Sequence, residues 1–334
     1  MSEPTTHACN AAPYRRSARA ILAGAFAALC LASSAPALAD DDSGNVRELL
    51  RAVKKARLID LSHTWDKHSP IASVNPTYSF ALEATHANTR GTFGDGGQLS
   101  FTSEVMHWSG QHGAPSIDAI GHIGRDGKLF GGLDAAAATS NPDGIGASGV
   151  GANLAIDQFP TDLLVNRGVL LDVARMVQGD VSPLPAVFEI TAAHLEQAAK
   201  RQRVRLNKGD TVFIRTGWGP HFTSNPGLYS GASSPGPGLN AAEFLIKHGA
   251  RVVGNDTLTF EKRPPITFEP NFQVFPVHMR LITDSGIYII ENLNLEALAQ
   301  AKAYEFVVVV PPLKILGGTG SAVRIFALVP RDDD

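Results

Sequence analysis

Strands and helices alternate along the middle of this 334-residue sequence, and this order predicts an α/β fold. Three apolar runs bounded by Gly or polar residues indicate buried strands, and two segments with helical patterns lie between them. In chain order these five segments are residues 168–173, 191–202, 208–218, 240–248 and 250–257. In such folds ligands collect at strand ends and in the loops beyond them.

The flanking segments fit the same prediction. Thr191 and Asn240 stand at the N-cap positions of the two helices, where side-chain oxygens accept backbone N–H bonds. The remaining expected elements are a helix at 46–56, a strand at 58–63, an irregular or hairpin region at 66–97, and strands at 99–107, 305–310 and 322–329.

The first 39 residues have the composition of a signal peptide. Three arginines precede an apolar run at 20–31, and Ala37-Leu38-Ala39 forms a small-x-small cleavage site. We therefore expect one mature domain, residues 40–334, that is exported to the periplasm. The paired arginines allow either the Sec or the Tat pathway.

Composition excludes several classes of function. Both cysteines, Cys9 and Cys30, lie in the segment expected to be removed, so thiolate chemistry and disulfides are not expected. Without that segment 26 basic and 31 acidic residues remain, a formal charge of −5. No basic run is present, which argues against a nucleic-acid partner. No later segment is long and apolar enough for a stable membrane anchor.

The stretch 109–124 carries the strongest chemical pattern. Among small residues it places polar side chains at even separations, namely His112, Ser116, Asp118 and His122. In an extended chain even spacing turns side chains toward one side. Two imidazoles and a carboxylate would then suit a divalent metal, zinc or manganese. The alternative is that each His lies in a loop and satisfies a backbone carbonyl.

This stretch resembles the signature His-x-Gly-Thr-His-x-Asp-x-x-x-His of the cyclase family of metal-dependent hydrolases. His112, Asp118 and His122 match its first, third and fourth functional positions, whereas Ser116 replaces the second His. The resemblance implies that the first three positions bind metal and that His122 acts as acid and base. A hydroxyl is a poorer ligand than imidazole, so the number of metal ions stays open.

Further segments resemble the family in the same chain order. They are Asp-Leu-Ser at 60–62, Gly-Asp-Thr-Val-Phe-Ile-Arg-Thr-Gly-Trp at 209–218, Gly-Asn-Asp-Thr at 254–257, Pro-Val-His at 276–278 and Glu-Asn-Leu at 291–293. The resemblance covers nearly all of the mature chain. It implies a swivelling β/β/α domain with a central mixed sheet, assembled as a homodimer or homotetramer.

The resemblance also assigns roles outside the central stretch. In family members with two metals, a His and a Glu at the positions of His278 and Glu291 contribute to the second site. Glu291 could instead cap the helix expected near residue 294, because helix N-termini favour negative charge.

Four more side chains are candidates for contacts with the metal ligands or with the substrate: His63, Ser116, Arg215 and Asp256. Each of the three outside the central stretch also has a structural alternative. His63 ends a strand, Arg215 needs a partner for a buried charge, and Asp256 could cap its own turn.

These features together predict a metal-dependent hydrolase that acts on an amide, formamide or lactone bond in a small, often cyclic, molecule. The metal would lower the pKa of bound water, and an imidazole is suited to moving protons near neutral pH. Two alternatives stay open. One is an exported small-molecule-binding protein with a degenerate metal site, and the other is a hydrolase with Ser116 as nucleophile, although no Gly-x-Ser-x-Gly elbow surrounds it.

Overall fold

The computed structural model of the chain describes residues 41–331. The predicted signal peptide, residues 1–39, lies outside the described residues together with both cysteines, so export stays a prediction. The chain divides into two units, residues 1–49 and residues 50–334, and the sheet and both cores belong to the second. Within the described part, the helices are all too short or too polar to cross a membrane.

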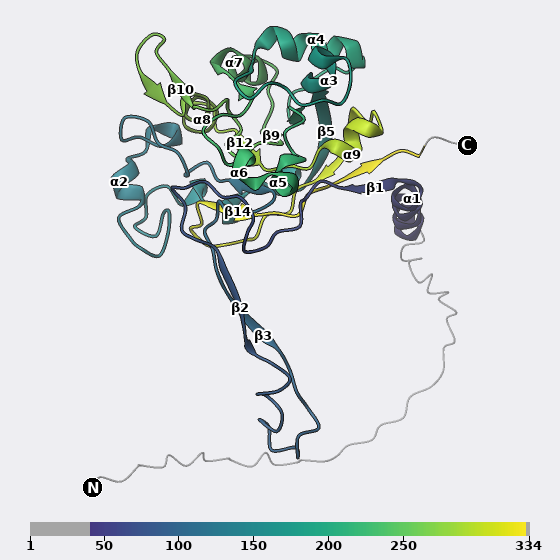
Figure 1. The fold of residues 1–334 in the computed structure, drawn as a ribbon, viewed down its shortest axis with the longest axis vertical. Helices are drawn as coiled ribbons and strands as arrows, with labels where there is room; N and C mark the ends of the chain where they lie inside the picture. Colours follow the sequence, from purple (N-terminus) through teal and green to yellow (C-terminus); the bar gives the residue numbers. More distant parts are fainter. Residues whose placement is uncertain (1–40, 332–334) are drawn as a thin grey trace, which may run out of the picture. The chain divides into compact units, whose positions relative to one another are not determined.

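Nine strands of the described chain form one mixed sheet, which confirms the predicted α/β class with a central mixed sheet (Figure 1). Its order is β1-β15-β13-β5-β7-β9-β12-β4-β14. The parallel block consists of β5 (Val165–Asp172), β7 (Thr211–Arg215), β9 (Val252–Asn255) and β12 (Tyr288–Glu291). The antiparallel strands are β1 (Arg57–Asp60), β15 (Phe326–Val329) and β13 (Glu305–Val309) on one side, and β4 (Ser116–Asp118) and β14 (Gly320–Ala322) on the other.

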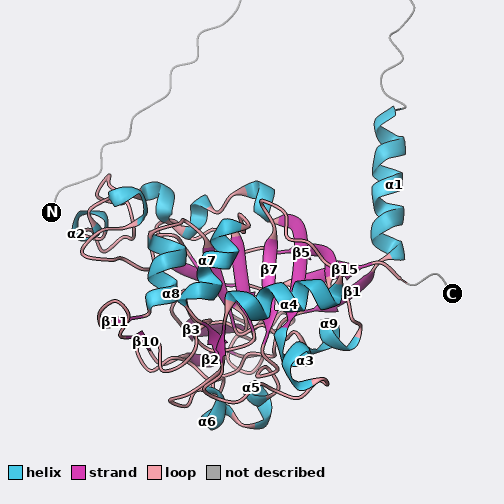
Figure 2. Cartoon of the chain, turned by 90° about the horizontal axis from the view of Figure 1, so that it is seen from above, coloured by secondary structure: helices cyan, strands magenta, loops and turns pink. Residues whose placement is uncertain are grey.

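Helices α4 (Ala192–Gln202) and α7 (Leu239–Lys247) lie over the parallel block, as Figure 2 shows. The other helices are α1 (Asp41–Lys55), α2 (Ala135–Ala138), α3 (Val173–Gln178), α5 (His221–Ser224), α6 (Pro226–Tyr229), α8 (Pro276–His278) and α9 (Glu296–Gln300). Short 3-10 segments are η1 (Phe130–Gly132), η2 (Ala152–Leu154), η3 (Ile156–Gln158) and η4 (Thr161–Leu163), and η5 (Met279–Thr283) is a π-helix.

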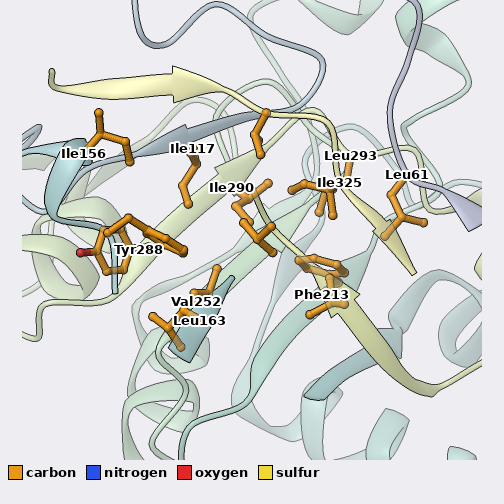
Figure 3. Packing of buried hydrophobic residues seen from close by; sticks show 14 of the residues in the cluster. Leu61, Ile117, Ile156, Leu163, Phe213, Val252, Tyr288, Ile290, Leu293 and Ile325 are labelled. Carbon is orange, nitrogen blue, oxygen red and sulfur yellow. The ribbon is translucent and has the colours of Figure 1, made fainter. Parts of the chain in front are cut away.

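Each face of the sheet has its own hydrophobic core. Along β5, Val169 and Leu171 belong to the core under α4 and α7, whereas Leu170 belongs to the opposite core. This alternation follows from the two-residue period of a strand, and both faces are covered, as expected for a parallel block. Figure 3 shows the second core, in which Ile117 of β4 and Ile290 of β12 pack together with other buried side chains. This packing fixes β4 and β12 from the face that carries Ile117 and Ile290.

Two details of the sequence prediction are corrected. Thr191 is the N-cap of α4 as predicted, but the N-cap of α7 is Gly238, not Asn240. The Asn240 Oδ1 instead accepts a bond from the Ala192 N–H at 2.5 Å, which joins the starts of the two helices. The strand expected at 322–329 is shorter than predicted: β15 spans 326–329, and Ala322 instead ends β14 at the opposite side of the sheet.

The region predicted to be irregular or a hairpin contains β2 (Ser79–Ala84), which pairs antiparallel with β3 (Ser103–His107). Both strands expose nearly every residue. Two shorter pairs complete the described elements: β10 (Ile266–Thr267) with β11 (Gln273–Val274), and β6 (Glu189–Ile190) with β8 (Gly236–Pro237).

Arg215, at the end of β7, is held by a buried ion-pair network. Its guanidinium donates to Asp172 Oδ1 at 3.0 Å, to Glu296 at 2.8 and 2.9 Å, and to the Val181 carbonyl at 2.7 Å. The side chain is fully buried. Of the two roles left open for Arg215, the structure shows the ion pair, which joins β5, β7 and α9.

Arg215→Met should lower the free energy of unfolding by about 3 kcal/mol, because it leaves Asp172 and Glu296 without a buried cationic partner. Urea unfolding measures the change. The matched control is Lys128→Met, which removes an exposed pair with Asp134 and should cost less than about 1 kcal/mol. Equal small losses in both variants would show that the network does not stabilise the fold.

Candidate metal centre

Three ionisable side chains from different elements converge at one end of the sheet. Asp118 ends β4, Glu291 ends β12 and His278 ends α8. One ligand atom of each lies within 4.8 Å of the other two. The His278 Nε2 is 3.2 Å from Glu291 Oε1 and 3.8 Å from Asp118 Oδ2. The sequence predicted all three as metal ligands, and the structure brings them together.

Strand register explains why the carboxylates meet. β4 pairs antiparallel with β12 so that Ser116 lies opposite Glu291 and Asp118 lies opposite Ile289. Opposite residues of an antiparallel pair, and alternate residues of one strand, project to the same face. Ser116, Asp118 and Glu291 therefore share one face. The buried Ser116 Oγ has no hydrogen-bond partner among the described residues, so it has no base to activate it as a nucleophile.

Glu261, which sequence reasoning missed, fixes the His278 imidazole. Its Oε1 accepts bonds from the backbone N–H of His278 at 3.0 Å and from Nδ1 at 2.6 Å. With the Nδ1 proton directed to Glu261, a neutral ring presents the Nε2 lone pair to Asp118 and Glu291. Carboxylates that orient ligating histidines in this way are common in metal sites. Glu261 lies five residues after the Asp256 position, in a bend that no strand pattern marks.

Burial of these groups shifts their pKa values strongly. Burial, together with the charges of Asp118 and Glu261, outweighs the opposing effect of His278 and raises the pKa of Glu291 to about 7. Burial disfavours the His278 imidazolium, but the hydrogen bonds and charges of Glu261 and Glu291 outweigh this and raise its pKa to about 10. Three carboxylates around one imidazole form an environment that favours positive charge.

His122 lies beside this cluster, as predicted for an acid/base residue. Its Nε2 is 3.9 Å from Asp118 Oδ1, and its side chain is 28% exposed, so solvent and a small molecule can reach it. On the other side of the ring, Gln111 Nε2 lies 3.2 Å from Nδ1 and 3.1 Å from Thr319 Oγ1. Gly320 permits this approach, because a Cβ there would lie 2.8 Å from Gln111 Nε2. Gln111 and Thr319 were not predicted.

His112 was predicted as a ligand, but the structure does not bring it into the cluster. Its Nδ1 accepts a bond from the Ser109 N–H at 2.9 Å, so a neutral ring carries its proton on Nε2. Neither nitrogen then offers a free lone pair. Burial lowers the pKa of His112, which favours this neutral form. The buried Nε2 has no partner among the described residues and is available as a donor.

Asp256 is fully buried and secures the loop after β7. Its carboxylate accepts bonds from Thr216 N–H at 2.8 Å, Thr216 Oγ1 at 2.7 Å and Gly217 N–H at 2.9 Å. Asp256 therefore fixes the end of β7 rather than capping its own turn.

A small cavity lies next to Glu291. Gln111 and Asn292 line it with Pro70, Ile71, Ala72, Asn75, Gly113 and Leu258. The Asn292 Nδ2 also donates to the Gly113 carbonyl at 3.2 Å, which joins β12 to the central stretch. A larger hollow, about 790 Å³, lies between α4 and α7, away from the carboxylate and imidazole cluster. The small cavity, about 10 Å³, has room for about one water molecule beside Glu291.

The donor set fits a divalent metal. Two carboxylates and one imidazole are ordinary ligands for zinc and manganese, and three protein ligands leave a position for water or substrate. Without a bound cation, the negative charges of the two carboxylates are balanced only by the His278 imidazole within this cluster.

Comparison with known proteins identifies the family of the chain. The family model for Cyclase matches residues 59–262, more than half of the chain. The chain belongs to the cyclase family. A curated relative is isatin hydrolase from Roseibium aggregatum, 28% identical over 152 residues, which cover 42% of this chain and 53% of the relative. The match thus spans about half the length of that relative.

Solved structures share the fold of this cyclase-family chain. A crystal structure described as a novel cyclase has a TM-score of 0.70 and 26% identity, and covers 85% of this chain and 92% of its own. Isatin hydrolase A from Labrenzia aggregata bound to benzyl benzoate has a TM-score of 0.62 and 22% identity, with coverage of 86% and 100%. The predicted cyclase-like architecture is confirmed.

His63, another predicted site residue, stacks on Phe222 with ring centroids 4.4 Å apart. Burial lowers its pKa to about 4 from the ordinary 6.5, although a bond to the Leu293 backbone opposes the shift. Its backbone N–H donates to the Ala114 carbonyl at 2.7 Å, so the ring lies against the central stretch.

His63→Gln in the metal-free cyclase should reduce the loss of stability on acidification. The unfolded chain binds more protons than the folded chain between pH 6.5 and about 4, so His63 destabilises the fold as the pH falls through this window. Urea unfolding at pH 7 and pH 5 should show a decline about 1–2 kcal/mol smaller in the variant. Exposed His68→Gln is the control, and identical declines in all three proteins would contradict a buried neutral His63.

Proposed function

We propose that this chain is a metal-dependent hydrolase that opens an amide, formamide or lactone bond in a small cyclic molecule. One observation carries the proposal: Asp118, His278 and Glu291 converge within 4.8 Å of one another beside His122. Family membership supports the same chemistry. The metal is proposed as zinc or manganese.

Asp118, Glu291 and the Nε2 of His278 would hold the metal, with Glu261 fixing the imidazole. A bound divalent metal would supply Lewis-acid polarisation of a carbonyl and a lowered pKa for water. His122 would give its Nε2 proton to the leaving nitrogen or oxygen and regain one from the attacking water. Gln111 Nε2, a donor 3.2 Å from Nδ1, keeps the proton of the neutral ring on Nε2, where this exchange needs it.

Ser116 and His112 complete the proposed site in altered roles. Ser116 lies opposite Glu291 with an unpartnered hydroxyl, and small residues of β14, Gly320 and Ala322, flank that part of β4. A water there would fill the place of the family His. The free Nε2–H of His112 suits a substrate carbonyl rather than the metal.

An isatin-like cyclic amide is the first substrate to test, since the curated relative is an isatin hydrolase. The aromatic side chains Trp65, Trp218 and Phe222 form one cluster with Leu258, which lines the cavity beside Glu291.

Removing the metal with EDTA should abolish turnover of isatin, related cyclic amides, formamides and lactones, and added Zn²⁺ or Mn²⁺ should restore it. Asp118→Ala should lose bound metal, measured by mass spectrometry of the elements, together with activity. His122→Ala should keep the metal and lose at least about 100-fold in kcat, because a positioned acid/base typically contributes that much.

The exposed His68→Gln serves as the control and should match the wild type. Full turnover in metal-free protein would contradict the proposed function. Tight binding of these compounds with no turnover of any would favour the alternative, a small-molecule-binding protein, which the replacement of the family His by Ser116 supports.

We further propose that the chain forms a homodimer or homotetramer through the β2–β3 hairpin. Phe80 lies opposite Met106, and both are exposed, as are Leu82 and Val105. A two-stranded hairpin with exposed faces is marginally stable in water alone. Phe93 and Phe101 add further exposed aromatic surface, and a few such side chains supply a large part of the roughly 800 Å² per partner of a stable interface.

Light scattering coupled to size exclusion should give a multiple of the chain mass for the wild type. Phe80→Ser with Met106→Ser should shift the population to the monomer, because it removes a facing apolar pair. The control is Leu316→Ser, which replaces a leucine outside the hairpin that is 83% exposed; it should leave the oligomeric state unchanged. A monomeric wild type, or an unchanged double variant, would contradict the assembly.

A further inference from the structure

Two polar groups near the metal centre are buried without partners. Ser234 and Arg263 face each other in an antiparallel bridge, in which the Arg263 N–H donates to the Ser234 carbonyl at 2.9 Å. The Ser234 Oγ and the Arg263 Nη1 are both buried, and neither has a hydrogen-bond partner among the described residues. Opposite residues of such a bridge project to the same side. Two unsatisfied donors together are costly, and each such group needs an explanation.

The chain places Arg263 close to the metal centre. Glu261, two residues earlier, lies in a bend and binds the His278 imidazole through its carboxylate. Lys262 between them binds outside the cluster, with its Nζ 2.7 Å from Glu189 Oε2. Burial lowers the pKa of Arg263, and the charge of Glu291 opposes this, so the two groups lie within electrostatic reach.

The missing partner of this pair is an acceptor. Glu291 is already engaged with His278 at 3.2 Å. A guanidinium and a hydroxyl both donate, and a carboxylate, which only accepts, can take bonds from both. A neutral carbonyl could accept such bonds but would leave the charge of the half-buried guanidinium uncompensated.

Hydrolysis itself produces such a group. Opening a cyclic amide breaks the C–N bond, adds hydroxide to the carbonyl carbon and a proton to nitrogen, and leaves a carboxylic acid and an amine; the acid releases a proton to solvent at neutral pH and becomes a carboxylate. A lactone leaves a carboxylate and a hydroxyl in the same way. A carboxylate already present on the substrate would have the same chemistry.

We infer that Arg263 and Ser234 form a carboxylate subsite beside the metal centre, for the acid group of the substrate or of the ring-opened product. The inference rests on the proposed function for the identity of the ligand, but the subsite can be tested without turnover. Arg263 is the specificity-determining residue, and Ser234 supplies the second donor.

The test uses the zinc-loaded full chain and two matched probes, benzoate and the neutral benzamide, measured by calorimetry. The wild type should bind benzoate at least about tenfold more tightly than benzamide. Arg263→Met should lose most of this preference, and Ser234→Ala part of it. Lys262→Met removes the neighbouring, outward cation and should keep the preference. Zinc can also bind benzoate, but it contributes equally in Arg263→Met and Lys262→Met, so their difference isolates Arg263.

Thermal unfolding without ligand separates this role from a structural one. Arg263→Met should leave Tm unchanged or raise it, because it removes a half-buried cation whose buried Nη1 has no partner among the described residues. A lower Tm with an unchanged preference for benzoate would overturn the inference and identify Arg263 as a structural partner of Glu291. Equal binding of both probes to the wild type would also overturn it. Benzoate binding through Arg263 without hydrolysis of any cyclic substrate would contradict the proposed function alone.

Kinetics then identify the source of the carboxylate. If the reaction forms it, Arg263→Met weakens inhibition by the acid product and leaves KM for a neutral substrate unchanged. If the substrate carries it, KM for that acidic substrate rises while KM for its neutral analogue does not. Unchanged values in both cases would contradict the subsite.

Discussion

Charge compensation in a buried space is the constraint on which this structure depends. Asp118, Glu261 and Glu291 surround the imidazole of His278, and all four are largely withdrawn from water. Isolated carboxylates at such depth would be very costly, so the cluster needs positive charge. The imidazolium supplies one charge, and a divalent cation would supply more. The raised pKa values of Glu291 and His278 both follow from this need for positive charge.

The sheet holds the ionisable side chains close together. β4 and β12 are paired in a register that puts Ser116, Asp118 and Glu291 on one face, and their other faces are fixed by the core residues Ile117 and Ile290. The buried ion pairs of Arg215 and the bonds of Asp256 fix neighbouring strand ends. Glu261 fixes the imidazole of His278. Rigid elements thus hold the ionisable groups close together, which flexible loops alone would not do.

The sequence could predict the helices and strands but not every contact between side chains that their packing creates. Even spacing placed Ser116 and Asp118 correctly, because β4 spans 116–118. It misplaced His112, since that residue lies in a turn where Ser109 donates to its ring. His278 and Glu291 came from the family resemblance. Glu261, Gln111 and Arg263 show no spacing signal, because their roles depend on which strand ends meet in three dimensions.

The central claim is that a divalent metal binds between Asp118, His278 and Glu291. Anomalous X-ray diffraction from crystals of the zinc-loaded protein, recorded on both sides of the zinc absorption edge, tests it most directly. The account predicts a single strong peak about 2.0–2.2 Å from the His278 Nε2 and from an oxygen of each carboxylate. A peak bound to His112 without these three side chains, or no peak in zinc-saturated crystals, would contradict it.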